Sequence, residues 1–199
     1  MKQNKTIGVT GISGSGQSTV AEILAELGGF VIHADKLAHE VIKRGNPAYD
    51  EIVKLFGSDI LDADGEINRR ALGAKAFGNG SISKLESIIH PKVLELIHKM
   101  KDESDCDFTV IDAPLLVESG LVNDCDFCWL VYAPDEILIE RICKRDKITP
   151  ESAKKRISAR KGYDHLRKYA DTVIVNDGDL NNLKTAVKNA IIKTTGANE

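Results

Sequence analysis

The sequence predicts an α/β protein built on a five-stranded, mainly parallel sheet. Strand-like and helix-like segments alternate along the chain, which is typical of parallel strands joined by crossover helices. Five segments of the sequence are strand-like. They comprise residues 6–10, 30–32, 108–111, 127–132 and 172–175. A glycine-rich turn follows the first strand and leads directly into a helix.

The helix after this turn is predicted over residues 17–27, because its apolar residues recur at helical spacing and two glycines follow. Its apolar face comprises Val20, Ile23, Leu24 and Leu27. A last helix is predicted to begin near Asp179, a suitable N-cap residue. Its apolar face comprises Leu180, Leu183, Val187, Ala190 and Ile191.

Two stretches of the sequence are not typical of simple crossover connections between strands. About 75 residues separate the second and third strands. Turn signals divide this insertion, so we expect several short helices forming a candidate substrate subdomain. The second stretch, residues 141–167, is rich in Arg and Lys. Thr149 followed by Pro150 predicts the start of a helix within it.

Composition limits the classes of partner. The chain has 199 residues, 42% of them hydrophobic, and a formal net charge of −3, so no nucleic-acid partner is expected. The sequence contains no apolar run of about 18 residues, and its first six residues are polar, so neither a membrane span nor a secretory signal is expected. The four cysteines predict no disulfide framework. We expect a cytoplasmic globular protein; the oligomeric state stays open.

The strongest local signal is the glycine-rich turn GISGSGQST over residues 11–19. A strand before it and a helix after it are the context of a phosphate-binding loop. The glycines allow main-chain N–H groups to point at phosphate oxygens, and the helix adds the positive end of its dipole. Ser18 is placed to bind a Mg²⁺ ion that bridges the outer phosphates. The alternative is a flexible Gly/Ser turn.

Gln17 departs from the phosphate-loop pattern G-x-x-x-x-G-K-[ST], which has lysine at this position. The amide can donate hydrogen bonds but carries no charge. Loss of one cation at a transferring phosphoryl group costs about 10²–10³ in rate. Either another cation replaces the lysine, or the chain binds nucleotide and catalyses poorly.

Two aspartates follow predicted strands. Asp35 can accept a proton from a hydroxyl and orient it, or it can cap the helix that follows. Asp112 can hold a Mg²⁺-bound water, or it can be a turn residue before Pro114. In the basic stretch, Arg141 and Arg145 are candidates for contacting phosphates, whereas a solvated face is the alternative.

The cysteine pair and the tryptophan are not expected to form a site. Cys125 and Cys128 lack a second pair at zinc-ligand spacing, so we expect no metal there. Trp129 lies within a predicted strand and is expected in the core.

Six further motifs, in order, make the chain resemble the dephospho-coenzyme A kinase family over nearly its whole length. They are HAD ending at Asp35, FG with DGEINRRAL over residues 56–72, His90 with Pro91, DAPLLVE over residues 112–118, Arg141 with Arg145, and AD, VI and Asn176 over residues 170–176. The departures are Gln17, Asn68, and Leu138 and Arg160 where the family often has glutamine.

The resemblance implies a P-loop kinase that uses ATP and Mg²⁺ to phosphorylate the ribose 3′-hydroxyl of dephospho-coenzyme A. It implies a core (residues 1–34, 106–145 and 170–194), a substrate subdomain (35–105) and a helical lid (146–169). The site residues it implies are catalytic Asp35 and Arg141; nucleotide-binding Gly14, Ser15, Gly16, Gln17, Ser18, Thr19 and Arg145; substrate-binding Thr10, Arg69, His90 and Leu115; and metal-binding Ser18 and Asp112. A kinase of this fold with another small acceptor, or a nucleotide- or coenzyme-sensing protein, remains an alternative.

Arg160 suggests where a replacement cation could come from. We expect that it, or else Arg156 or Lys161, closes onto the phosphates when the lid moves. The alternative is that Arg160 is one more exposed charge on a basic helix.

Overall fold

The fold was analysed in a computed structural model, which describes residues 5–78, 80–159 and 162–196. The chain divides into two compact units, one of residues 1–32 with 105–199 and one of residues 33–104. In the described part, no helix combines the length and the apolar character that crossing a membrane requires.

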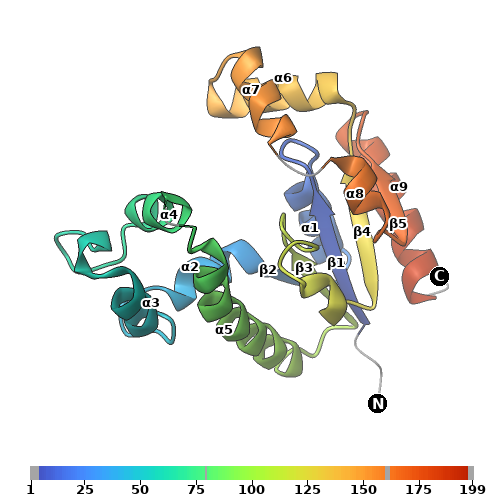
Figure 1. Cartoon of the computed structure of the whole chain (residues 1–199). Helices are drawn as coiled ribbons and strands as arrows, with labels where there is room; N and C mark the ends of the chain where they lie inside the picture. The colour runs from blue at the N-terminus through green and yellow to red at the C-terminus, as the bar shows by residue number, and fades with distance from the viewer. Residues whose placement is uncertain (1–4, 79, 160–161, 197–199) are drawn as a thin grey trace. The chain divides into compact units, whose positions relative to one another are not determined.

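The first unit is organised around a sheet in the order β2-β3-β1-β4-β5 (Figure 1). The strands are β1 (Lys5–Gly11), β2 (Phe30–His33), β3 (Phe108–Asp112), β4 (Phe127–Tyr132) and β5 (Thr172–Val175). Strand β1 is central and pairs in parallel with β3 and β4, and β4 pairs in parallel with β5. The predicted five-stranded parallel sheet is therefore confirmed, with each strand within two residues of its expected bounds.

Helices α1 (Gln17–Glu26) and α9 (Leu180–Thr195) cover one face of this sheet. Alternate strand residues point to this face, among them Ile7 and Val9 of β1 and Trp129 of β4, and all three are fully buried. The predicted apolar stripe of α1 supplies the facing side chains. The core position expected for Trp129 is confirmed, and Asp179 is the N-cap of α9, as predicted.

The opposite face carries a smaller apolar cluster that includes Leu130 of β4. Leu138 of α6 (Asp135–Asp146) and Leu166 of α8 (Tyr163–Arg167) pack there, and Ile157 of α7 (Pro150–Ser158) contacts the cluster. The side chain of Thr149 accepts a hydrogen bond from the N–H of Ser152, which confirms the helix start predicted before Pro150. A short 3₁₀ helix, η2 (Leu121–Asp124), precedes β4.

The second unit is helical. It contains α2 (Ala34–Val41), α3 (Tyr49–Phe56), the 3₁₀ helix η1 (Ser58–Ile60), α4 (Arg69–Gly78) and α5 (Ile82–Asp102). Buried Ile52, Phe56, Leu72 and Ile97 line the interior of these helices. Several helices were expected here, but α5 is not short, because its 21 residues continue through Pro91. Pro91 therefore lies inside this helix and does not mark its start.

Asn68 shows why one departure from the family pattern is harmless to the fold. Its Oδ1 accepts hydrogen bonds from the N–H groups of Arg70 and Ala71, each over 3.1 Å. These bonds satisfy the first turn of α4, and asparagine caps helices about as well as aspartate. The substitution thus keeps the capping function that an aspartate would have.

Candidate functional site

The glycine-rich turn joins the carboxyl end of β1 to the start of α1. Gly14 and Gly16 both have left-handed backbone conformations, with φ of 88° and 92°. Gly16 is the N-cap of α1 and offers no side-chain oxygen to the first turn. The N–H groups at this helix start are therefore placed to bind an anion.

Space as well as backbone conformation restricts these positions to glycine. A Cβ atom on Gly14 would lie 3.1 Å from the carbonyl oxygen of Leu138. On Gly16 it would lie 2.1 Å from Nδ2 of Asn176, closer than real Cβ atoms approach other atoms. The turn is packed against α6 and the end of β5, so the reading of it as a freely flexible turn is not supported.

Ser15 places a fully buried hydroxyl within the loop. In the described part of the chain, its Oγ accepts and donates no hydrogen bond, although the residue is fully buried. A buried polar atom without a partner is costly, and functional sites are one place where such atoms persist. Ser15 lies within the loop, so this hydroxyl is a ligand-binding candidate, consistent with its expected nucleotide contact.

Gln17 links the loop to β3. Its Nε2 donates to the carbonyl oxygen of Val9 over 3.0 Å and to Oδ1 of Asp112 over 2.6 Å. Val9 and Asp112 are register partners on adjacent strands, so one amide reaches both. The side chain that was expected to contact phosphate is thus bonded to the residue that was expected to bind the metal.

Arg141 extends from α6 to the loop. Its Nη1 donates to the carbonyl oxygen of Gly14 and its Nη2 to Oδ1 of Asn176, each over 3.4 Å. The amide of Asn176 is buried and donates in turn to the carbonyl oxygen of Ser15 over 2.7 Å. Arg141 thus lies beside the loop, where a guanidinium can contact phosphate oxygens in pairs.

Arg145 reaches the loop from the last turn of α6. Its Nη2 donates to Oγ of Ser13 over 3.2 Å, and its Nε donates to Asp146 over 2.7 Å. Asp146 also pairs with Arg156 of α7. Hydrogen bonds from Arg145, followed by those from Arg156, lower the pKa of Asp146 to about 2. This carboxylate therefore joins the two cationic side chains at physiological pH.

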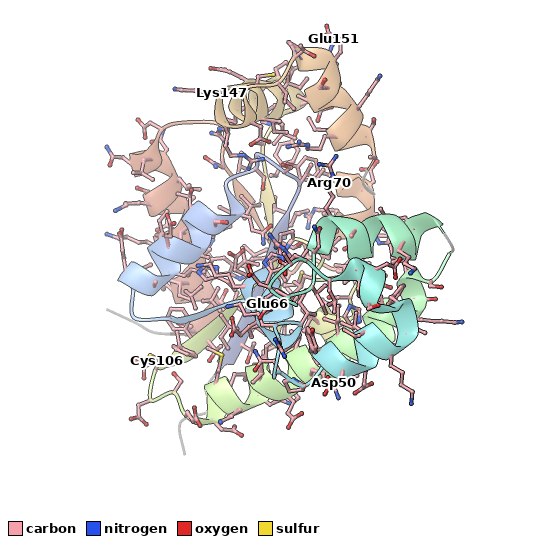
Figure 2. The ribbon with its side chains drawn as sticks, turned by 90° about the vertical axis from the view of Figure 1, so that its left-hand side faces the viewer. Asp50, Glu66, Arg70, Cys106, Lys147 and Glu151 are labelled. Carbon is pink, nitrogen blue, oxygen red and sulfur yellow. The ribbon has the colours of Figure 1, made fainter. Side chains whose placement is uncertain are left out.

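The bonds of Asp146 also concern the expectation that a cation from the basic stretch replaces the missing lysine. Arg156 is already paired with Asp146, while Arg160 and Lys161 lie outside the described residues. Figure 2 shows Lys147 at the turn between α6 and α7, and Glu151 in the first turn of α7. The compensation expected from this stretch stays a prediction.

Two of the expected substrate residues belong to the first unit. Thr10 is buried, and its hydroxyl donates to the carbonyl oxygen of Pro114 over 3.1 Å. Leu115 is 44% exposed, which is unusual for leucine and compatible with contact to a ligand. The substrate roles of both residues stay predictions.

The other expected residues lie in the second unit. Asp35 is the second residue of α2, and His33 is the N-cap, so the capping role for Asp35 is wrong. One turn later His39 contacts Arg69 through its Nε2. Burial, then the positive charge of Arg69, lowers the pKa of His39 below its ordinary value, while Asp35 raises it. His90 is half-buried in the middle of α5.

The site offers oxygen donors for Mg²⁺ but no complete set of protein ligands in the described part of the chain. Within the described ranges, no three His, Cys, Asp or Glu side chains form a group that could hold a metal by themselves. Exposed Ser18, at the start of α1, and Asp112, at the end of β3, offer the oxygen donors that Mg²⁺ takes together with phosphates and waters. The residues fit a metal that arrives with a nucleotide.

Burial raises the pKa of Cys128 to about 11, so this thiol is inert.

Sequence reasoning did not select three residues that the structure places at the site. Asn176 binds the loop, Asp146 joins two arginines, and Tyr163 packs on Tyr132 and accepts a hydrogen bond from the N–H of Ala133. Asn176 closes the last family motif, which was the available signal. Asp146 and Tyr163 carry no motif.

Known proteins resemble this chain in sequence and in structure. A model of the dephospho-CoA kinase family matches residues 5–182. The dephospho-CoA kinase of Carboxydothermus hydrogenoformans is 39% identical over 185 residues, covering 91% of this chain and 90% of that protein. The structure of TT1252 from Thermus thermophilus aligns with a TM-score of 0.83 at 30% identity, covering 96% and 98% of the two chains. That of the Campylobacter jejuni dephospho-CoA kinase aligns with a TM-score of 0.70 at 29% identity, covering 98% of each chain.

Proposed function

The chain belongs to the dephospho-CoA kinase family, and on that premise we propose that it transfers the γ-phosphoryl group of ATP to the ribose 3′-hydroxyl of dephospho-coenzyme A. The observation that carries the proposal is the loop between β1 and α1. Two left-handed glycines shape it, a helix N-terminus follows it, and a buried serine hydroxyl within it has no partner in the described part of the chain. These features suit the phosphates of a nucleotide.

Residues of the first unit act on ATP. The loop from Gly14 to Thr19 binds the phosphates through main-chain N–H groups, and Arg141 and Arg145 neutralise their oxygens. Ser18 and Asp112 hold Mg²⁺, which when bound offsets negative charge on the outer phosphates. Catalysis rests on positioning and charge stabilisation and needs no covalent intermediate on the protein.

The remaining proposed site residues act on the acceptor. Asp35 accepts the proton of the attacking hydroxyl and orients its oxygen toward the γ-phosphorus. Arg69, exposed at the start of α4, is suited to an anionic group of the substrate, and His90 contacts the same molecule. Thr10 and exposed Leu115 complete the proposed substrate contacts.

The test is ADP release by purified protein with ATP, Mg²⁺ and dephospho-coenzyme A. Asp35→Asn should lower turnover by about 10²–10⁴ with ATP affinity unchanged. Asp50→Asn is a matched control, because Asp50 is also an acidic residue in the first turn of a helix of the same unit. Equal turnover of the two variants would contradict the assignment of Asp35.

A second candidate is a protein that binds both ligands and turns over little, and Gln17 favours it. The two candidates separate in the same assay. ADP release that dephospho-coenzyme A does not accelerate, with both ligands still bound in calorimetry, would establish the sensing protein. A related kinase with another acceptor would instead show acceleration by that acceptor alone.

A further inference from the structure

The amide of Gln17 has a single possible orientation. Its exposed fraction is 8%, and its Nε2 bonds to the carbonyl oxygen of Val9 and the carboxylate of Asp112. Both partners only accept, so the nitrogen must face them, and both of its protons are used. The remaining atom, Oε1, accepts hydrogen bonds and cannot donate one to a phosphate.

With glutamine at position 17, the site therefore has one positive charge fewer than a phosphate-binding loop with lysine at this position. Lysine would offset the negative charge of Asp112 and also attract phosphate oxygens. Gln17 fixes the position of Asp112 but contributes no counter-charge to it. Asp112 is only 6% exposed, and charges interact more strongly where water is scarce. ATP thus brings further negative charge toward a carboxylate that residue 17 does not neutralise.

We propose that Gln17 is a positioning residue that holds Asp112 for a divalent cation, and that it makes ATP binding by this chain depend on that cation far more than a lysine would. The inference rests on the proposed function, because it takes ATP and Mg²⁺ as ligands. In this proposal the metal supplies the positive charge that a lysine would have supplied. No cation from residues 156–161 is then required.

The experiment measures ATP affinity by calorimetry in Mg²⁺ and again in EDTA, and the readout is the ratio of the two dissociation constants. For the wild type we expect affinity to fall by about 100-fold without Mg²⁺, within the range of strong coupling between two ligands. Gln17→Lys should bind metal-free ATP about tenfold more tightly and lower the ratio by about the same factor. Gln17→Met, of similar length without donors, should lower the ratio by about fivefold without improving metal-free binding.

Asp112→Asn provides the decisive control. If Gln17 acts through Asp112, then Gln17→Met in the Asp112→Asn background should leave the ratio unchanged, because residues sharing one function give non-additive effects. Thermal melting of each variant shows whether it is folded before titration. Gln17→Lys retains a donor toward Val9 and Asp112, so it tests the proposal even if Gln17→Met fails to fold.

Two results would overturn the inference. One is a wild-type ratio that Gln17→Lys leaves unchanged, and the other is additive effects of Gln17→Met and Asp112→Asn. Failure of the proposed function looks different, because the wild type would then not bind ATP at millimolar concentration even with Mg²⁺. Normal turnover on dephospho-coenzyme A with an unchanged ratio would refute the inference alone.

Discussion

Asn176 donates a 2.7 Å hydrogen bond from its buried Nδ2 to the carbonyl oxygen of Ser15, so the residue after β5 fixes the main chain of the glycine-rich loop. The same side chain accepts from Arg141 through its Oδ1. One amide therefore determines the position of the loop and of a proposed phosphate ligand.

Removing this amide should loosen the loop. Asn176→Ala leaves the carbonyl oxygen of Ser15 without its buried partner, which costs about 1–3 kcal/mol of unfolding free energy. We also expect weaker MgATP binding, because the loop is no longer held in one conformation. Denaturant unfolding and calorimetry measure the two effects. Asn189→Ala, on the exposed side of α9, should change neither, and an equal loss in both variants would contradict the role of Asn176.

Gly16 and Gly28 provide a matched pair for the loop backbone. Both have a φ of 92°, but a Cβ on Gly28 would meet nothing within 4 Å, whereas one on Gly16 would clash with Asn176. Each change to Ala incurs about 1–3 kcal/mol of left-handed strain. Gly16→Ala should in addition lower ATP affinity at least about tenfold, or about 1.4 kcal/mol. Calorimetry on both variants checks this, and unchanged affinity in Gly16→Ala would show that the loop does not bind the nucleotide.

Replacing Thr6 or Thr10 of β1 by valine should change the unfolding free energy in opposite directions. Both are buried, but among the described residues the hydroxyl of Thr6 has no hydrogen-bond partner, while that of Thr10 donates to Pro114. Thr6→Val should raise the unfolding free energy by about 1 kcal/mol because it removes an unsatisfied polar atom. Thr10→Val should lower it by about the same amount. Urea unfolding midpoints with equal slopes measure both, and a loss in Thr6→Val would mean that its hydroxyl is satisfied.

His39 should make the stability of the second unit dependent on pH. Its pKa in the folded chain lies below the ordinary value of 6.5, mainly because of burial and then because of Arg69. Between the two values the unfolded chain binds the extra proton, so stability is complete above about pH 6.5 and falls as pH drops toward the folded pKa. An NMR titration of the His39 ring gives that pKa directly.

Variants of its neighbours provide the control for His39. Arg69→Met should raise the pKa of His39 and Asp35→Asn should lower it further, because these two charges act on the imidazole in opposite directions. A midpoint at the ordinary value in the wild type, or shifts of the opposite sign in the variants, would contradict the contact. Arg69→Met should still leave the pKa below the ordinary value, since burial is the larger cause.

The elements of the fold were predictable where local signals agreed. The strand of residues 127–132 was predicted with its exact bounds, because an apolar run there follows Asp126 and ends shortly before Pro134. Helix α5 was not, because proline usually marks a helix start, whereas Pro91 lies inside a helix whose Val93 and Ile97 are buried. Packing of the second unit outweighs the local preference of proline there.

The part of the candidate site that depends on local sequence signals was also predictable. The spacing of the glycines indicated the loop, because glycine is the residue that most readily adopts positive φ. The bonds from Gln17 to Asp112 and from Asn176 to Ser15 join residues far apart in sequence, and they depend on which strands become neighbours. The capping role of Asp35 failed because α2 begins at Ala34, two residues before the start that an N-cap at Asp35 would give.

The central place of β1 has a consequence for how the chain is made. This strand is synthesised before its partners β3 and β4, which follow about 100 residues later, as the pairing of Lys5 with Phe108 shows. Until they emerge, both edges of β1 are unpaired and open to association with other nascent chains. The glycine-rich loop, although synthesised early, can take its final shape only after residue 176 is complete, because Asn176 holds it. Ligand binding should therefore appear late in synthesis, in a single step with closure of the sheet.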